Sequence, residues 1–380
     1  MRYGASESAE QDEVSPAARR VSFGTAALCA ALGCAADSQP GAATEPAAEQ
    51  SEIAPLASKA LLLDVAYADR RIVVVGERGI ILLSDDQAKS WRQAPAPTLS
   101  SLTAVYFADA THGWAVGQDE VILRSDDGGE HWTRTHFNPD AQQPLLDVWF
   151  ADADHGIAVG AYNAYHVSAD GGRTWVPQPF APIVAKGKDV KPAKPVAAAD
   201  ELGDGSEGVQ YHLNGIAAAA PPRLYLAAES GHLYRSDDTG VTWTTLPSPY
   251  EGSFFGLLPL DGDAVLAFGM RGHLYRSENA GADWTEIPTG TLAMLTSAVR
   301  LPDGGVALTG LAGVLLVSTD GAHTFKVEQQ ADRKGMSSAV LVGDQLLTVG
   351  EGGVLLRPLA PQERGLTPLG SDPSKPKAGT

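Results

Sequence analysis

The chain has 380 residues, among them 41 glycines and 25 prolines, and carries a formal net charge of −18 at pH 7. This acidity argues against nucleic acid as a partner, because phosphate-backbone binding needs a basic footprint that releases counterions. Short apolar runs broken by Asp, Asn and Gly are typical of an all-β chain rich in turns. No amphipathic helical stretch follows the first 35 residues.

Residues 1–34 resemble an export signal. Arg19 and Arg20 precede mostly apolar or small residues from 21 to 33, a run too short to span a bilayer. The run Ala31–Cys34 resembles a bacterial lipoprotein box, in which the cysteine becomes the lipidated first residue. We therefore expect an exported lipoprotein of the periplasm or cell envelope, or of the thylakoid lumen if the cell is photosynthetic, held at the membrane through Cys34. A plain signal peptide and an intracellular protein stay open as alternatives.

The two cysteines, Cys29 and Cys34, both lie in this segment, so the folded body is expected to hold no disulfide. Residues 35–50 are rich in Ala, Pro, Gln and Glu and are expected to form a flexible linker, because they cannot bury enough apolar surface to fold. The folded domain is predicted over 51–360, with an insertion at about 176–210, and 361–380 is predicted to be a disordered tail.

A box of the form Ser-x-Asp-x-Gly-x-x-Trp recurs along the chain with a period of about 41 residues. The three complete copies are Ser125-Asp127-Gly129-Trp132, Ser168-Asp170-Gly172-Trp175 and Ser236-Asp238-Gly240-Trp243. The three degenerate copies are Ser84-Asp86-Ala88-Trp91, Ser277-Asn279-Gly281-Trp284 and Ser318-Asp320-Ala322-Phe325. Asp and Ser side chains accept hydrogen bonds from backbone N–H groups in such turns, and Gly supplies positive φ, so we interpret each box as a structural turn.

An apolar strand ending in a Gly-rich turn precedes each box, and a seventh copy of this strand and turn lies at Val349–Gly353. Each repeat then has room for four short strands. A four-stranded sheet cannot bury both faces alone, so the repeats predict a seven-bladed β-propeller. The seventh repeat has only three strands before Pro358, and Glu52–Ala57 is predicted to supply the fourth and close the ring.

The sequence contains no pattern that we interpret as a catalytic or metal site. One carboxylate per box falls short of calcium coordination. His232 and His273 occupy equivalent places in two repeats and lack a third ligand at metal spacing, so we expect no metal and no cofactor. Asp-box propellers include sialidases, whose substrate carboxylate is held by three arginines. No such triad is evident, so we predict a non-enzyme and keep a carbohydrate-active or carbohydrate-binding propeller as the alternative.

Blade two of the predicted propeller carries a longer pattern: Leu102–Phe107, then His112–Gly117, then the box Ser125–Trp132. This sequence pattern resembles that of the photosystem II stability and assembly-factor family, and the resemblance extends over about residues 60–357. The resemblance implies a seven-bladed propeller without enzymatic activity that holds segments of membrane-protein partners during the biogenesis or maintenance of a membrane complex. It also implies binding through a basic patch, whereas this chain is acidic, so no binding residue is carried over.

A protein partner is expected on the face that carries the Gly-rich turns and the crossovers between blades, since the box turns lie on the opposite face. The candidate contacts are the tips of these turns: Arg78, Gln118, Tyr162, Asn163, Glu229, Arg271 and Glu351. Tyr162 and Tyr165 leave a polymer-binding surface open as a third class. The protein is expected to be a monomer.

Overall fold

The computed structural model describes residues 49–184 and 210–359, which all belong to one compact unit, Ala47–Thr380. The predicted signal, the lipidation site Cys34, nearly all of the predicted linker and the predicted tail lie outside the described residues. Among the residues that are described, no helix has the length and apolar character needed to cross a membrane.

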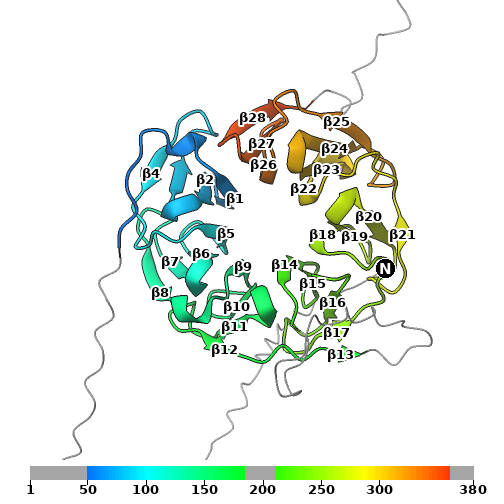
Figure 1. Ribbon diagram of the computed structural model, residues 1–380, viewed down its shortest axis with the longest axis horizontal. Coiled ribbons are helices and arrows are strands. Elements are labelled where there is room, and N and C mark those ends of the chain that lie inside the picture. Colours follow the sequence, from blue (N-terminus) through cyan, green and yellow to red (C-terminus); the bar gives the residue numbers. More distant parts are fainter. Residues whose placement is uncertain (1–48, 185–209, 360–380) are drawn as a thin grey trace, which may run out of the picture. The chain divides into compact units, whose positions relative to one another are not determined.

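Seven sheets, antiparallel apart from one added strand in blade four, follow one another around a central opening, so this part of the chain is a seven-bladed β-propeller (Figure 1). In blades one to three the strands are β1 (Leu62–Ala68), β2 (Arg71–Gly76), β3 (Ile81–Ser84), β4 (Arg92–Ala94), β5 (Leu102–Phe107), β6 (Gly113–Gly117), β7 (Ile122–Ser125), β8 (Thr133–His136), β9 (Leu145–Phe150), β10 (Gly156–Gly160), β11 (Tyr165–Ser168) and β12 (Val176–Pro177).

Blade four contains β14 (Leu213–Ala218), β15 (Leu224–Ala228), β16 (Leu233–Ser236) and β17 (Thr244–Thr245), and β13 (Ile183–Val184) pairs in parallel with β17 as a fifth strand. The remaining strands are β18 (Phe254–Pro259), β19 (Val265–Gly269), β20 (Leu274–Ser277), β21 (Thr285–Glu286), β22 (Leu295–Arg300), β23 (Val306–Gly310), β24 (Val314–Ser318), β25 (Lys326–Gln329), β26 (Met336–Val342), β27 (Gln345–Gly350) and β28 (Leu355–Pro358). Two pieces of the predicted insertion at 176–210 are thus strands, β12 and β13, and residues 185–209 lie outside the described part.

Short 3₁₀ turns complete the elements: η1 (Ala57–Lys59), η2 (Glu77–Gly79), η3 (Gln118–Glu120), η4 (Pro139–Ala141), η5 (Ala161–Asn163), η6 (Met270–Gly272), η7 (Pro302–Gly304) and η8 (Leu311–Gly313). Five of them, η2, η3, η5, η6 and η8, form the turn between the second and third strands of a blade. The second strands of the blades are almost entirely buried, as in β2 and β6. Neighbouring sheets pack through these strands, so the core consists of clusters shared between adjacent blades.

Blade seven contains three strands, β26, β27 and β28, within the described residues. The prediction that Glu52–Ala57 adds a fourth strand to it is not confirmed, because this segment has no strand and runs into η1. Backbone bonds instead attach the segment to both sides of the junction. Ser51 donates its N–H to the carbonyl of Ala96 after β4, and the carbonyl of Ser58 accepts the N–H of Val354 before β28.

Blades one and seven therefore meet through side-chain packing. Their shared cluster joins Leu62, Ile72 and Val74 of blade one to Leu347 and Val349 of blade seven, and Ala57 of η1 is buried against it. A fourth strand is dispensable in this arrangement, since the apolar faces of the two blades already cover each other.

Candidate functional site: turn face and central channel

The box turns share one hydrogen-bonding pattern. In all six boxes the serine Oγ lies 2.7–3.0 Å from the Asp or Asn Oδ1 two residues on. The same Oγ accepts the backbone N–H four residues on, at 2.8–3.0 Å. Asn279 accepts the N–H of Asp283 at 2.9 Å, just as Asp238 accepts that of Thr242 at 2.8 Å, so Asn can replace Asp in the box.

The box residues also join neighbouring blades. The Trp132 and Trp175 indoles donate to the carbonyls of Gly129 and Gly172 in their own boxes. The arginines that precede the box serines reach further: Arg124 donates to Gly171 of the next box, and Arg235 donates to Ala280. These arginines hold adjacent blades together and do not converge on a pocket.

The opposite ends of the strands form what we call the turn face, made of the seven turns between second and third strands and the crossovers that enter each blade. Six of these turns place two successive residues at positive φ, as at Arg78 (54°) and Gly79 (68°), which is the type I′ geometry that suits a twisted hairpin. At all seven turns one backbone N–H donates to the start of the inner strand, as Gln118 does to Ser101. The turn face is therefore built on a regular, rigid frame.

The seven predicted contact residues all lie on this face, but they fall into two groups. The side chains of Asn163, Glu229 and Glu351 accept backbone N–H groups of the crossovers, from Tyr211, His212 and Gly335 respectively. These three side chains hold the turns in place. The other four, Arg78, Gln118, Tyr162 and Arg271, are exposed tips.

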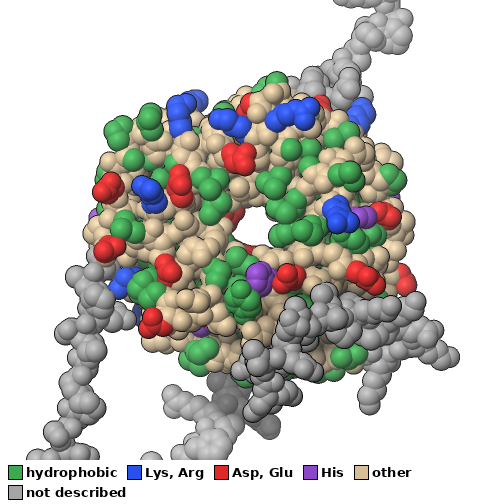
Figure 2. Space-filling view, in the orientation of Figure 1, with side chains coloured by type: hydrophobic (Ala, Val, Ile, Leu, Met, Phe, Trp, Pro, Cys, Tyr) green, Lys and Arg blue, Asp and Glu red, His purple; other side chains and the backbone are tan. Residues whose placement is uncertain are grey.

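Large apolar side chains are also exposed on the turn face. Tyr162, Met270 and Leu292 have exposed fractions of 48, 43 and 85%. Leu61, Leu99 and Leu311 are exposed on the same turns and crossovers. Figure 2 shows apolar side chains gathered around the central opening, with charged groups of both signs scattered among them.

The central channel is lined by the inner strands, each of which carries a β-bulge near its start. The unpaired bulge residues occupy equivalent places in the seven blades: Leu63, Thr103, Leu146, Asn214, Phe255, Thr296 and Ser337. Three of them bond to the next blade, because Thr103, Asn214 and Thr296 donate to the carbonyls of Leu145, Phe254 and Met336. A bulge turns these side chains toward the channel and toward the neighbouring blade.

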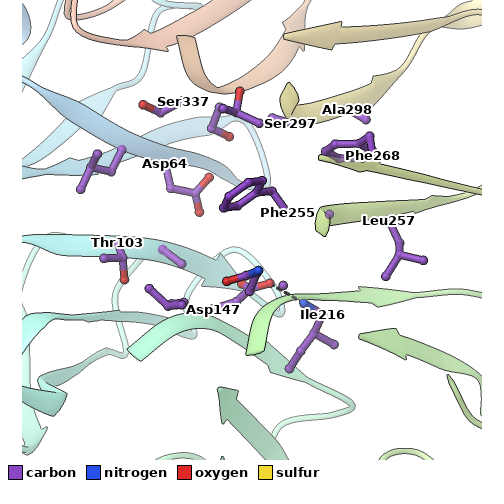
Figure 3. Close-up of a pocket in the computed structure, with 18 residues that line it drawn as sticks. Asp64, Thr103, Asp147, Ile216, Phe255, Leu257, Phe268, Ser297, Ala298 and Ser337 are labelled. Atoms are coloured by element: carbon purple, nitrogen blue, oxygen red, sulfur yellow. Dashed lines mark hydrogen bonds between the residues drawn. The ribbon is translucent and has the colours of Figure 1, made fainter. Parts of the chain in front are cut away.

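Two carboxylates lie in the channel, Asp64 on β1 and Asp147 on β9, and Figure 3 shows them among the lining residues. Asp64 Oδ2 accepts the N–H of Val105 at 2.9 Å, and Asp147 Oδ2 accepts that of Ile216 at 2.7 Å, in each case from the following blade. Burial raises the pKa of Asp64 to about 6. Burial, and secondly the nearby Asp64 charge, raises the pKa of Asp147 to about 7.

His232 and His273, the two histidines considered above as possible metal ligands, both have structural partners. His232 Nδ1 lies 2.9 Å from the carbonyl of Glu229, and its ring lies 4.0 Å from that of Tyr211. His273 has the equivalent place beside Tyr250, at 4.1 Å. A different group, Glu120, His136 and His166, comes together between blades two and three, and the sequence analysis did not single it out.

The fold and these turns define the class, a seven-bladed β-propeller with Asp-box turns. Residues 83–143 match the family model described as "Photosynthesis system II assembly factor YCF48". The photosystem II stability/assembly factor HCF136 of Cyanidioschyzon merolae is 37% identical over 60 residues, which cover 15% of this chain and 14% of that protein. The photosystem II assembly protein Ycf48 of Synechococcus sp. is 32% identical over 68 residues, which cover 16% of this chain and 20% of that protein. The matched segments thus span a fifth or less of these relatives.

The solved structure of "YCF48 bound to D1 peptide" superposes with a TM-score of 0.59 over 82% of this chain and 96% of that chain, at 18% identity. At this identity the likeness concerns the fold. The chain is a photosystem II assembly-factor-like propeller, and both the resemblance and the seven-bladed fold expected from the sequence are confirmed.

Proposed function

We propose that this propeller is a non-catalytic assembly factor that binds segments of membrane-protein subunits during the biogenesis or maintenance of a membrane complex. The observation that carries the proposal is the match of residues 83–143, the region of the second blade, to the assembly-factor family. The two relatives with similar segments are named as photosystem II assembly factors, and one structural neighbour is described as bound to a D1 peptide.

The turn face supplies the binding surface in this proposal. An extended segment of a membrane protein presents apolar side chains, and Tyr162, Met270 and Leu292 offer exposed apolar area to them. Arg78 and Arg271 are exposed at turn tips and form no ion pair within the described residues, so both are available to acidic groups of a partner. A rigid frame favours binding because little ordering is needed when the partner arrives.

The residues that line the channel favour the assembly-factor function over the carbohydrate-active alternative. Two carboxylates line it, but among its described lining residues there is no arginine to hold a sugar carboxylate. Burial and bonds from the next blade account for both carboxylates as parts of the ring.

The proposal also places the protein outside the cytoplasm, attached to the membrane through Cys34. A labelled fatty acid fed to cells should enter the wild-type chain and not Cys34→Ala. Equal labelling of both, or labelling of neither, would contradict the anchor.

The direct test of the function is crosslinking in living cells with the tagged full chain, followed by mass spectrometry of the captured proteins. We expect reproducible capture of membrane-complex subunits above a tag-only control. Capture should fall in the double variant R78E/R271E and persist in R70E, because Arg70 lies in the β1–β2 hairpin on the face of the box turns. Capture that is absent, or that is equal in both variants, would contradict the proposal.

A further inference from the structure

Three side chains with metal-binding atoms meet between blades two and three. Glu120 ends η3, His136 ends β8, and His166 lies in β11 of the following blade. His136 Nε2 lies 3.3 Å and His166 Nε2 4.0 Å from Glu120 Oε2, and one ligand atom from each residue lies within 4.8 Å of the others.

Glu120 departs from the pattern of the other repeats. At the same place in the turn, five blades have glycine: Gly79, Gly231, Gly272, Gly313 and Gly353, at φ of 68 to 80°. Asn163 occupies it in blade three at 60°, and Glu120 occupies it in blade two at 50°. A left-handed conformation costs a residue with a Cβ roughly 1 kcal/mol, so the local backbone gains nothing from glutamate here.

His166 departs from the pattern as well. It lies two residues before the box serine, where the other boxed blades have Leu82, Leu123, Tyr234, Tyr275 and Leu316. All of these side chains are buried. An imidazole in place of leucine loses apolar packing and brings a polar group into the core. Two such departures that meet at one point indicate a site with a purpose beyond folding.

The cluster is buried, so leaving its carboxylate without a cation costs free energy of folding. The Glu120 and His166 side chains are each 4% exposed, and His166 Nδ1 is buried without a hydrogen-bond partner. A buried carboxylate needs hydrogen bonds, a partner of opposite charge or a metal to compensate for its lost hydration, and a cation would supply that compensation here.

We propose that Glu120, His136 and His166 bind a divalent transition-metal ion of the Zn²⁺ type. Two imidazoles and one carboxylate are a ligand set that such ions favour, with a fourth position left for water. Tetrahedral bonds of about 2.0–2.2 Å put ligand atoms about 3.4 Å apart, so the 3.3 Å pair already fits and the 4.0 Å pair would have to close by about half an ångström. His136 is the most exposed of the three side chains, at 23%.

The ion would join two blades, because β8 and η3 belong to blade two and β11 to blade three. It would also hold the tip of the η3 turn, where the predicted contact residue Gln118 is exposed. Metal binding then stabilises the folded ring by mass action and fixes one turn of the turn face.

The test is calorimetric titration of Zn²⁺ into the full chain after chelator treatment, with Co²⁺ absorption as a second readout of tetrahedral coordination and Mg²⁺ as a probe that should not bind. We expect one Zn²⁺ per chain and a higher Tm with the metal. The variants E120G and H166L copy the residues of other blades and so should fold, and their affinity for Zn²⁺ should fall roughly tenfold or more.

The matched control is His155→Ala, which removes an exposed histidine of a β9–β10 hairpin paired with Asp152. Its Zn²⁺ affinity should equal that of the wild type. The proposal is overturned if the wild type binds no Zn²⁺, if E120G and H166L bind it as the wild type does, or if His155→Ala weakens binding equally. If either blade-derived variant fails to fold, His136→Gln gives the same comparison at a more exposed position.

Discussion

The carboxylate of Asp64 on β1 accepts the backbone N–H of Val105 on β5 at 2.9 Å, so a side chain of blade one is bonded to the inner strand of blade two. Ser338 of blade seven bonds to the same carboxylate. Asp64 therefore connects three consecutive blades around the junction where blades one and seven meet. Asp147 bonds in the same way to Ile216 of blade four.

The channel carboxylates predict that stability falls as pH rises. The pKa of Asp147 is about 7 in the folded protein against an ordinary 3.8, so between these values the folded state binds more protons than the unfolded state. The free energy of unfolding should therefore decrease between about pH 4 and pH 7. Asp147→Asn should be more stable than the wild type at pH 8 by about 1–2 kcal/mol, after allowance for channel water, and the difference should be smaller at pH 5 and vanish below about pH 4.

Urea unfolding at both pH values measures this difference, and Asp140→Asn on exposed η4 is the control that should follow the wild type. A variant that is less stable than the wild type at pH 8 would show that the charged form of Asp147 is needed.

The box carboxylates predict the opposite behaviour in acid. Hydrogen bonds from the Thr174 backbone and hydroxyl lower the pKa of Asp170 to about 2. This stabilisation is fully present above about pH 4 and is lost as pH falls toward 2. Because Asn279 accepts the equivalent backbone N–H in box five, Asp170→Asn should fold and should lose less of its Tm between pH 4 and pH 2 than the wild type does. Identical acid profiles for the variant and the wild type would refute the prediction.

The box serines predict a larger effect on stability. Ser236 is 1% exposed, and its hydroxyl both accepts the N–H of Gly240 and donates to Asp238. Removing it leaves buried groups without partners, so Ser236→Ala should lower the free energy of unfolding by about 1–3 kcal/mol. Thr133→Ala, on the exposed outer strand β8, is the control and should change it by less than about 0.5 kcal/mol. Equal losses in the two variants would show that the box turn is dispensable.

Attachment of the N-terminal segment to blade seven predicts a difference between two glycines of that blade. Gly353 and Gly343 both have positive φ, 74° and 60°. A Cβ at Gly353 would lie 2.1 Å from the carbonyl oxygen of Ser58, whereas one at Gly343 would meet nothing within 4 Å. Gly353→Ala should therefore lower the Tm well beyond Gly343→Ala, because it also separates Ser58 from the last hairpin.

Deleting residues 51–58 should lower the Tm as well, since Ser51 and Ala57 are buried. An unchanged Tm after this deletion would mean that side-chain packing between blades one and seven closes the ring by itself.

The architecture could be predicted from the sequence because each repeat carries its own turn signals. The boxes give the period of the repeat, and the seven apolar strands that end in Gly-rich turns give the number of blades and their buried second strands. Ring closure could not be predicted in detail. A missing fourth strand suggested a replacement strand, but the contacts that join blades one and seven are side-chain packing and the bonds of Asp64, which leave no periodic pattern.

The candidate site was predictable in position and less so in role. The repeats place the turn tips on one face, yet Asn163, Glu229 and Glu351 hold crossovers in place, and only the three-dimensional arrangement shows this. The Glu120 cluster was missed because its residues come from two blades. Its signal was present in the repeat comparison, where a glutamate replaces glycine and a histidine replaces leucine or tyrosine.

The measurement that tests the binding face most directly is site-specific photocrosslinking in cells, with a photoreactive amino acid at Arg271 on the turn face or at Arg70 on the box face. We predict that the turn-face position forms a crosslinked adduct with a membrane-complex subunit and that the box-face position forms none. Adducts at Arg70 with none at Arg271 would contradict the account, because the partner would then bind the opposite face.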